Sequence, residues 1–319
     1  MRTRVVVIVV IVAVLAVVAA LLYFLLREAP PEPPIPGEPT PVEPTVEAEP
    51  AVLWAAGDIA RCDRDGEPEE GAVLTAELIE QDDGIVAALG DLAYPDGTEE
   101  DFEECYDQTW GAFRDRTRPA LGNHDDNTDE GDPYFEYFES LDMPEPEGWY
   151  SYELGEWHVI VLNSNCGNVG GCDEGDPQGE WLREELDQVD TDNILAYWHN
   201  PLFSAGEHGN FDRVEDLYEM LDEAGADVIL TAHDHDYQRW APQRADGTLD
   251  PEAPRQFVIG TGGAELRAFN EGEEPEALEY YQGEEHGVLR LELGSCGYSW
   301  EYLNVDGDVL DEGTGEDTC

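Results

Sequence analysis

The sequence predicts an α/β fold: a four-layer α-β-β-α sandwich of two mixed sheets flanked by helices, preceded by an N-terminal transmembrane helix. From residue 51 onward, short apolar runs alternate with amphipathic stretches, which is the pattern of strand–helix units. Residues 256–309 are instead nearly all strand, with a tight turn marked by Asp306-Gly307. Strand–helix units followed by antiparallel strands favour two packed sheets with helices outside.

The N-terminal segment predicts a membrane anchor. Residues 5–26 are 22 residues without charge, proline or glycine. A helix of that length measures about 33 Å, enough to cross a hydrocarbon core. Arg2 and Arg4 precede the run and favour a cytoplasmic N-terminus. We therefore expect residues 1–28 to be an uncleaved signal anchor of a single-pass protein whose following domain lies outside the cytoplasm. A cleaved signal peptide, the alternative, would leave a secreted protein.

Composition divides the remainder into a spacer and a folded domain. Residues 29–50 are rich in proline and glutamate and predict an extended linker, which leaves residues 51–319 as the domain. The chain has 75 acidic and 15 basic residues, a net charge of −60. Such a surface repels nucleic acids and anionic lipids, so nucleic acid is excluded as a structural partner. Membrane contact is expected through the N-terminal helix only.

Six cysteines predict disulfides in an exported domain. Six cysteines allow fifteen pairings, and the sequence alone does not choose among them. Cys166 and Cys172 flank a glycine-rich loop and form a plausible local pair. The other pairs that we expect are Cys62–Cys105 and Cys296–Cys319. The chain has no C-x-x-C spacing, which argues against a thiolate zinc site.

Residues with oxygen or imidazole donor atoms, which can bind metal ions, follow the predicted strands. Ligands of open α/β sheets bind beyond the carboxyl ends of the strands, where loops from different units converge. Oxygen and imidazole donors without thiolates suit iron, manganese and zinc, and one carboxylate can bridge two ions about 3.5–4 Å apart. The residues at these junctions are Asp58, Asp91, Tyr94, Asn123, His124, His199, His233 and His235.

The order GD…GDxxY…GNHD…H…HxH resembles the calcineurin-like metallophosphoesterase superfamily and, within it, the purple acid phosphatases. The resemblance covers nearly all of residues 51–309. The discriminating residue is Tyr94, three residues after Asp91, because a tyrosine there binds ferric iron in purple acid phosphatases. The resemblance implies a site for Fe(III) and a site for a divalent ion (Fe, Zn or Mn) that share Asp91. The Fe(III) ligands would be Asp58, Tyr94 and His235, and the divalent ligands Asn123, His199 and His233.

The resemblance also implies substrate contacts and an activity. His124 would contact the substrate phosphate and protonate the leaving group, and the stretch AGEHG (205–209) would supply His208 as a second contact. Hydroxide formed at the metals would then hydrolyse small phosphate monoesters. Two positions depart from the family pattern, Ala60 where glycine or histidine is usual and Ala232 where glycine is usual. Each adds only a methyl group, so we expect a slight shift in geometry.

Two other functions remain open at this stage. A phosphodiesterase or nucleotidase could use two divalent ions without ferric iron. A non-catalytic surface binding module could retain the fold, although such a protein would be expected to lose a bridging aspartate or an H-x-H histidine. Both residue types are present here. His158 and His286 are expected to pack or pair without taking part in chemistry.

Overall fold

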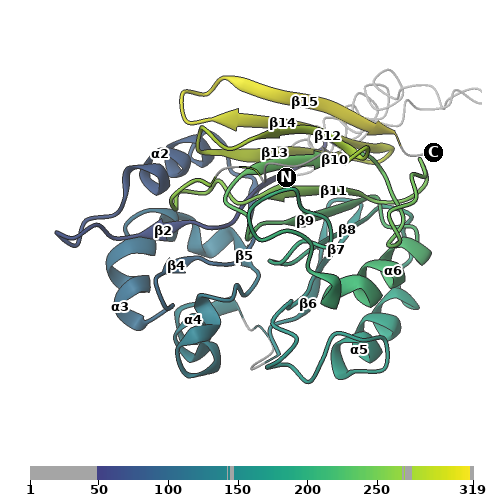
Figure 1. Cartoon of the computed structure of the whole chain (residues 1–319), viewed down its shortest axis with the longest axis horizontal. Coiled ribbons are helices and arrows are strands. Elements are labelled where there is room, and N and C mark those ends of the chain that lie inside the picture. The colour runs from purple at the N-terminus through teal and green to yellow at the C-terminus, as the bar shows by residue number, and fades with distance from the viewer. Residues whose placement is uncertain (1–48, 142, 144–146, 268, 270–274, 317–319) are drawn as a thin grey trace, which may run out of the picture. The chain divides into compact units, whose positions relative to one another are not determined.

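The structure is a computed structural model that describes residues 49–141, 143, 147–267, 269 and 275–316. The predicted membrane helix and most of the predicted linker lie outside the described residues. Within the part of the chain that is described, no helix is both long and apolar enough to cross a membrane. Two large sheets form the described domain, and Figure 1 shows them stacked with helices around them.

The first sheet has six strands in the order β15-β14-β13-β1-β3-β5. Strands β1, β3 and β5 run parallel, whereas β13 pairs with β1 in the antiparallel sense and continues into an antiparallel meander. This sheet is therefore mixed, as predicted. Its strands are β1 (Ala51–Ala56), β3 (Ile85–Ala88), β5 (Thr117–Pro119), β13 (Gly287–Gly294), β14 (Gly297–Asn304) and β15 (Val309–Glu316).

The second sheet has seven strands in the order β12-β10-β11-β9-β8-β7-β6. Four strands in its middle run parallel, and antiparallel strands flank them on both sides, so this sheet is mixed too. Its strands are β6 (Tyr150–Leu154), β7 (Trp157–Val161), β8 (Ile194–Tyr197), β9 (Val228–Thr231), β10 (Tyr237–Trp240), β11 (Arg255–Ile259) and β12 (Leu278–Gln282).

Alternate residues of the second sheet face two different cores. Val159 and Leu195 join the core that also contains Leu53 of β1. Ile160 and Ile229 instead pack in a second cluster with residues of helices α5 (Pro177–Leu186) and α6 (Glu215–Glu223). This period of two is what a strand buried on both faces requires. Helices α5 and α6 therefore cover the outer face of this sheet, as Figure 1 shows.

The helical layer beside the six-stranded sheet is only partial. Helix α2 (Glu70–Ile79) joins the main core. The short helices α3 (Glu99–Asp101) and α4 (Asp132–Tyr137) lie near a two-stranded sheet of β2 (Ala60–Arg61) and β4 (Ala93–Tyr94). On the outer face of β13 and β14, Glu292 is exposed and Arg290 and Glu301 are partly exposed. The prediction of two mixed sheets is confirmed. The prediction of a helical layer on each side holds fully only for the seven-stranded sheet.

Two of the three expected disulfides are confirmed. Cys62 pairs with Cys105, and Cys166 pairs with Cys172. Cys296 is disulfide-bonded, while Cys319, the partner predicted for it, lies outside the described residues.

Candidate metal centre

The strand ends bring the predicted ligands to one edge of the two sheets. Asp58, Asp91 and Asn123 follow the parallel strands β1, β3 and β5. The histidines come from the other sheet, His199 after β8 and His233 after β9. Parallel strands end at a common edge, so side chains more than 30 residues apart in the sequence become neighbours. Tyr94 reaches the same place from β4 (Ala93–Tyr94), which pairs with β2 (Ala60–Arg61) in a separate two-stranded sheet.

Three of these residues have an unusual backbone conformation. The φ angle is +55° at Asp58, +51° at Asp91 and +71° at His233, a region that residues other than glycine rarely adopt. Such a conformation costs about 1–3 kcal/mol and persists only where surrounding contacts impose it. Here the His233 N–H donates to Asp58 Oδ2 at 2.8 Å, and the Asp58 N–H donates to the carbonyl oxygen of Gly90 at 3.1 Å. Strain of this kind concentrates at functional sites.

Asp58, Tyr94 and His235 converge closely, and we call these three residues the Tyr94 half. The Tyr94 hydroxyl lies 2.6 Å from Asp58 Oδ1 and 3.1 Å from His235 Nε2. It also lies 3.0 Å from Oδ2 of Asp91. His235 Nε2 is 3.1 Å from Asp58 Oδ1, and all four side chains are buried. Oxygen and nitrogen donors thus surround one point.

Asn123, His199 and His233 form the second group, which we call the Asn123 half. His199 Nε2 lies 3.2 Å from Asp91 Oδ2 and 3.3 Å from His233 Nδ1. Donor atoms of Asp91, His199 and His233 all lie within 4.8 Å of one another, a spacing that could hold a metal ion. Because Asp91 Oδ2 contacts both Tyr94 and His199, this one oxygen belongs to both halves.

The side-chain oxygen of Asn123 indicates that these residues fit a metal ion. Its side-chain oxygen Oδ1 is buried and has no hydrogen-bond partner among the described residues. Leaving such an acceptor unsatisfied costs about 1–3 kcal/mol. Asn123 follows β5 at the same sheet edge as Asp91, so a cation bound there is the partner that this oxygen lacks. Carbonyl oxygen, carboxylate and imidazole form a suitable donor set for a divalent ion such as zinc, iron or manganese. The Asn123 half therefore fits a metal ion.

Hydrogen bonds outside the donor set orient the ligands. Nδ1 of His199 donates to the Leu89 carbonyl oxygen at 2.9 Å, and Nδ1 of His235 donates to the Glu265 carbonyl oxygen at 2.6 Å. Both rings consequently present Nε2 to the centre, the arrangement usual for metal-binding histidines. The His124 N–H donates to Asp91 Oδ1 at 2.7 Å, which leaves Oδ2 for the two halves.

The electrostatics of the centre favour ionised carboxylates. Burial alone would raise the pKa of Asp58, but the charge and hydrogen bond of His235 hold it well below its usual value. Burial of Asp91 is likewise outweighed by His199, which lowers the pKa of Asp91. Burial and the charges of Asp58 and Asp91 raise the pKa of Tyr94 well above 10. The Tyr94 phenol is therefore protonated unless a bound cation displaces its proton.

The two predicted catalytic histidines lie beside the donor cluster. Nδ1 of His124 donates to the Pro95 carbonyl oxygen at 2.5 Å, and its Nε2 lies 3.9 Å from Asp91 Oδ2. The His124 side chain is 31% exposed, so it can be reached from solvent. The ring of His208 lies 4.4 Å from the ring of His233, measured between centroids. All nine predicted site residues are therefore brought to one region.

Several contributors were missed by sequence reasoning. The buried carboxylate of Asp125 accepts from the N–H groups of Leu92, Ala93 and Gly122, and so ties together the turns after β3 and β5. Asp234 accepts from the His208 N–H at 2.8 Å and fixes that loop. Asp125 directly follows the predicted catalytic residue His124, and Asp234 directly follows the predicted ligand His233. In a chain with 75 acidic residues that position was too weak a signal.

Two arginines place positive charge at the centre. The Arg61 guanidinium lies over the Tyr94 ring, 5.1 Å from its centroid. The Arg267 guanidinium donates to Nε2 of His208, and the Arg267 N–H donates to the carbonyl oxygen of His235 at 3.0 Å. These two arginines offset part of the negative charge that Asp58 and Asp91 bring to the centre.

The departure at Ala232 has a local explanation. A Cβ on Gly57 would lie only 2.6 Å from the Ala232 methyl group, so the missing side chain of Gly57 makes room for it. Gly122 is constrained in a similar way, because a Cβ there would lie 2.0 Å from the Asp91 nitrogen. The turn before Asn123 can therefore approach the shared aspartate only as glycine.

Fold and donor set together define a class of protein: an α/β domain of two packed sheets with a candidate metal site at the strand ends. The family model described as calcineurin-like phosphoesterase matches residues 52–237, more than half of the chain. The chain therefore belongs to the calcineurin-like phosphoesterase family. The matched segment contains all seven predicted metal ligands and both predicted catalytic histidines.

Known proteins point to one branch of that family. The chain is 26% identical to purple acid phosphatase 15 of Arabidopsis thaliana over 63% of this chain and 44% of the relative. It is 24% identical to purple acid phosphatase 22 of the same plant, over 77% of this chain and 60% of the relative. Among solved structures, purple acid phosphatase PPD1 from yellow lupin (Lupinus luteus) seeds shares the fold, with a TM-score of 0.71 at 20% identity. That match covers 84% of this chain and 54% of the lupin chain. The chain spans about half the length of these relatives.

Proposed function

We propose that this protein is an exported, membrane-anchored phosphatase that hydrolyses phosphate monoesters at a dinuclear centre of Fe(III) and a divalent ion. The observation that carries the proposal is the position of Asp91 Oδ2, which lies 3.0 Å from the Tyr94 hydroxyl and 3.2 Å from His199 Nε2. One carboxylate oxygen between two donor sets is what two neighbouring ions need as a bridge. The purple acid phosphatases among the relatives support the same assignment.

The two halves would hold different ions. Asp58, Tyr94 and His235 would bind Fe(III), because carboxylate and phenolate oxygens are anionic donors that suit a highly charged cation, and purple acid phosphatases are among the relatives. Asn123, His199 and His233 would bind the divalent ion, which can be Fe, Zn or Mn. When bound, such a metal pair supplies Lewis-acid charge and lowers the pKa of water.

The remaining side chains would act on the substrate. Nδ1 of His124 keeps its proton in the bond to the Pro95 carbonyl oxygen, so a proton on Nε2 requires the doubly protonated ring. In that form Nε2, which faces Asp91, would pass its proton to the leaving oxygen. His208 and Arg267, which contact each other, would hold oxygen atoms of the phosphate. A guanidinium offers several fixed donors, which match a phosphate dianion better than a singly charged diester. These contacts favour a monoester as the substrate.

The metal content and the substrate preference test this proposal together. We expect the purified full-length chain to contain close to one iron and one further metal, and to show a visible tyrosinate–iron absorption band. It should hydrolyse 4-nitrophenyl phosphate with a higher kcat/KM than bis(4-nitrophenyl) phosphate. A fully active protein that contains two zinc ions and no iron would instead support a phosphodiesterase or nucleotidase of the two-divalent-metal type.

The location is a separate part of the proposal. It rests on the apolar run at residues 5–26 and on the even number of cysteines, two pairs of which form disulfides between described residues. In intact cells, protease added from outside should remove the domain, and the chain should sediment with membranes. A chain that is protected from protease in intact cells and digested only after lysis would contradict this location.

A further inference from the structure

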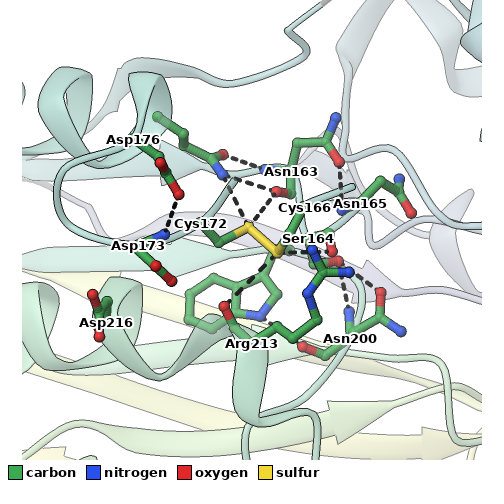
Figure 2. The surroundings of a disulfide bond; sticks show 12 residues. Asn163, Ser164, Asn165, Cys166, Cys172, Asp173, Asp176, Asn200, Arg213 and Asp216 are labelled. Atoms are coloured by element: carbon green, nitrogen blue, oxygen red, sulfur yellow. Dashed lines mark hydrogen bonds between the residues drawn. A yellow bond between two sulfur atoms is a disulfide. The ribbon is translucent and has the colours of Figure 1, made fainter. Parts of the chain in front are cut away.

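The loop that follows β7 holds the two turns that carry Asn123 and His199. We propose that Asn165 is a positioning residue for the Asn123 half, and that the Cys166–Cys172 disulfide keeps Asn165 in place. Figure 2 shows this disulfide with Ser164, Asn165 and Asn200 grouped beside it. The proposal rests on the proposed function, because it concerns the divalent ion that the Asn123 half would hold.

Asn165 acts on the turn that precedes Asn123. Its side-chain nitrogen Nδ2 donates to the Gly122 carbonyl oxygen at 3.1 Å. Gly122 in turn packs so tightly on Asp91 that a Cβ would lie 2.0 Å from the Asp91 nitrogen. A hydrogen bond that fixes Gly122 therefore fixes the orientation of Asn123 and the approach of this turn to the shared aspartate.

The preceding residue acts on the turn that carries His199. The Ser164 hydroxyl donates to Asn200 Oδ1 at 2.8 Å and accepts from the Asn200 N–H at 3.0 Å. Asn200 follows His199 directly, so this reciprocal pair holds the backbone on which the imidazole is mounted. Two consecutive residues of one loop thus support two ligands of the same half.

The loop itself is held at both ends. On one side, the Asn165 N–H donates to Asn163 Oδ1 at 2.9 Å, and Asn163 exchanges two hydrogen bonds with the buried Gln178 of α5. On the other side, the disulfide closes the chain between Cys166 and Cys172 directly after Asn165. Both cysteines are buried, with 2% of each exposed. The disulfide therefore restricts the backbone that presents Asn165.

The support is selective for one half. The Tyr94 half is instead fixed by bonds to other segments, such as His235 Nδ1 to the Glu265 carbonyl oxygen and the Asp58 N–H to the Gly90 carbonyl oxygen. Weakening the loop after β7 should consequently loosen the divalent ion and leave the iron in place. Changes to residues outside the ligand set typically reduce metal affinity by about 10–100-fold.

The test is zinc release from the full-length chain loaded with iron and zinc. Asn165→Ala should release zinc to a chelator about tenfold faster than wild type, while the visible tyrosinate–iron band and the melting temperature change little. The matched control is Asn193→Ala. Asn193 also donates from its side chain to a main-chain carbonyl, that of Glu156, but it precedes β8 at the end opposite His199. This control should release zinc at the wild-type rate.

Two further variants protect the test against misfolding. Ser164→Ala removes the hydrogen bonds of the Ser164 hydroxyl with Asn200. The double variant Cys166→Ala/Cys172→Ala removes the disulfide that closes the loop. Each variant should also release zinc faster than wild type while the tyrosinate–iron band is retained. Zinc release at the wild-type rate in all three variants would overturn the proposal, as would loss of iron and zinc together. A wild-type chain that binds neither metal would overturn the proposed function as well, so the two failures are distinguishable.

Discussion

The two halves of the metal centre differ in how completely the protein encloses them. In the Tyr94 half the donors already pair with one another at 2.6–3.1 Å, and the side chains of Asp58 and His235 are 0% and 5% exposed. In the Asn123 half one buried oxygen has no partner among the described residues, and the neighbouring His124 is 31% exposed. Closed metal sites are generally structural, whereas catalytic sites keep an open position.

This difference suggests a division of labour. The enclosed half gathers two carboxylates and a phenol, which favours a highly charged ion that stays bound. The open half has neutral donors besides the shared Asp91, and it is bordered by His124 and His208. Substrate would therefore approach from the side of the Asn123 half.

The largest effect is expected at Asp91, the residue that both halves share. Asp91→Asn removes the charge that serves both halves, so both metals should be lost. We expect kcat/KM for a phosphate monoester to fall on the order of 10³-fold, since metal ions contribute several kcal/mol to such reactions. Metal analysis and steady-state kinetics check this. Asp187→Asn, on the exposed surface, is the control. Retention of both metals by Asp91→Asn would contradict the bridging role.

Tyr94→Phe should affect only the enclosed half. The phenol oxygen is the group that would give the visible band, so the band should disappear while the divalent ion remains bound. Absorption spectroscopy and metal analysis measure the two effects separately. The control is Tyr106→Phe, because Tyr106 is also buried but its hydroxyl has no hydrogen-bond partner among the described residues. An unchanged band in Tyr94→Phe would show that this tyrosine is not an iron ligand.

Without metals, the free energy of unfolding should depend on pH through the titration of the ligand histidines. Burial disfavours the charged form of His199, but Asp91 outweighs it and raises the pKa of His199 to about 9 from its usual 6.5. Protonated His199 therefore stabilises the metal-free fold fully below pH 6.5, and this contribution is lost as the pH rises through about 9. His235, whose pKa is raised beside Asp58, acts in the same direction.

Urea unfolding of the chelator-treated protein measures this effect. The free energy of unfolding should fall between pH 6.5 and 9, and it should fall less in the variant His199→Asn. Metal-loaded protein should show a smaller slope, because bound ions replace the protons. Identical slopes for the metal-free wild type and for His199→Asn would show that the ion pair with Asp91 contributes nothing to stability.

The smallest effect is expected from the electrostatic field that the chain's negative charge creates around the metal centre. A net charge of −60 should repel an anionic substrate, and added salt screens distant carboxylates by shortening the Debye length. We expect kcat/KM for a monoester dianion to rise with salt by less than about tenfold, and by less for a singly charged diester. A steady fall with added inert salt would instead show that Arg61 and Arg267 steer the substrate into the open half.

Much of the centre could be predicted from the sequence because of one regularity of parallel sheets. The apolar runs before Asp58, Asp91 and His199 predict buried strands, and the ends of such strands must meet at one edge. This regularity predicts that these residues lie together, whereas their division into ligands of two ions came from the resemblance to the purple acid phosphatases. The disulfides are a different case. The expected pairs Cys62–Cys105 and Cys166–Cys172 are present, but the sequence by itself does not choose among the fifteen possible pairings.

Only the tertiary structure decided what orients these ligands. Asn165 and Gly122 are 43 residues apart, and Ser164 and Asn200 are 36 residues apart. Their side chains look like ordinary loop residues in the sequence, as does Arg267 beside His208. A hydrogen bond needs positions correct to a few tenths of an ångström. Periodicity fixes which face a residue occupies, whereas a contact at that precision depends on how both sheets and their loops pack together.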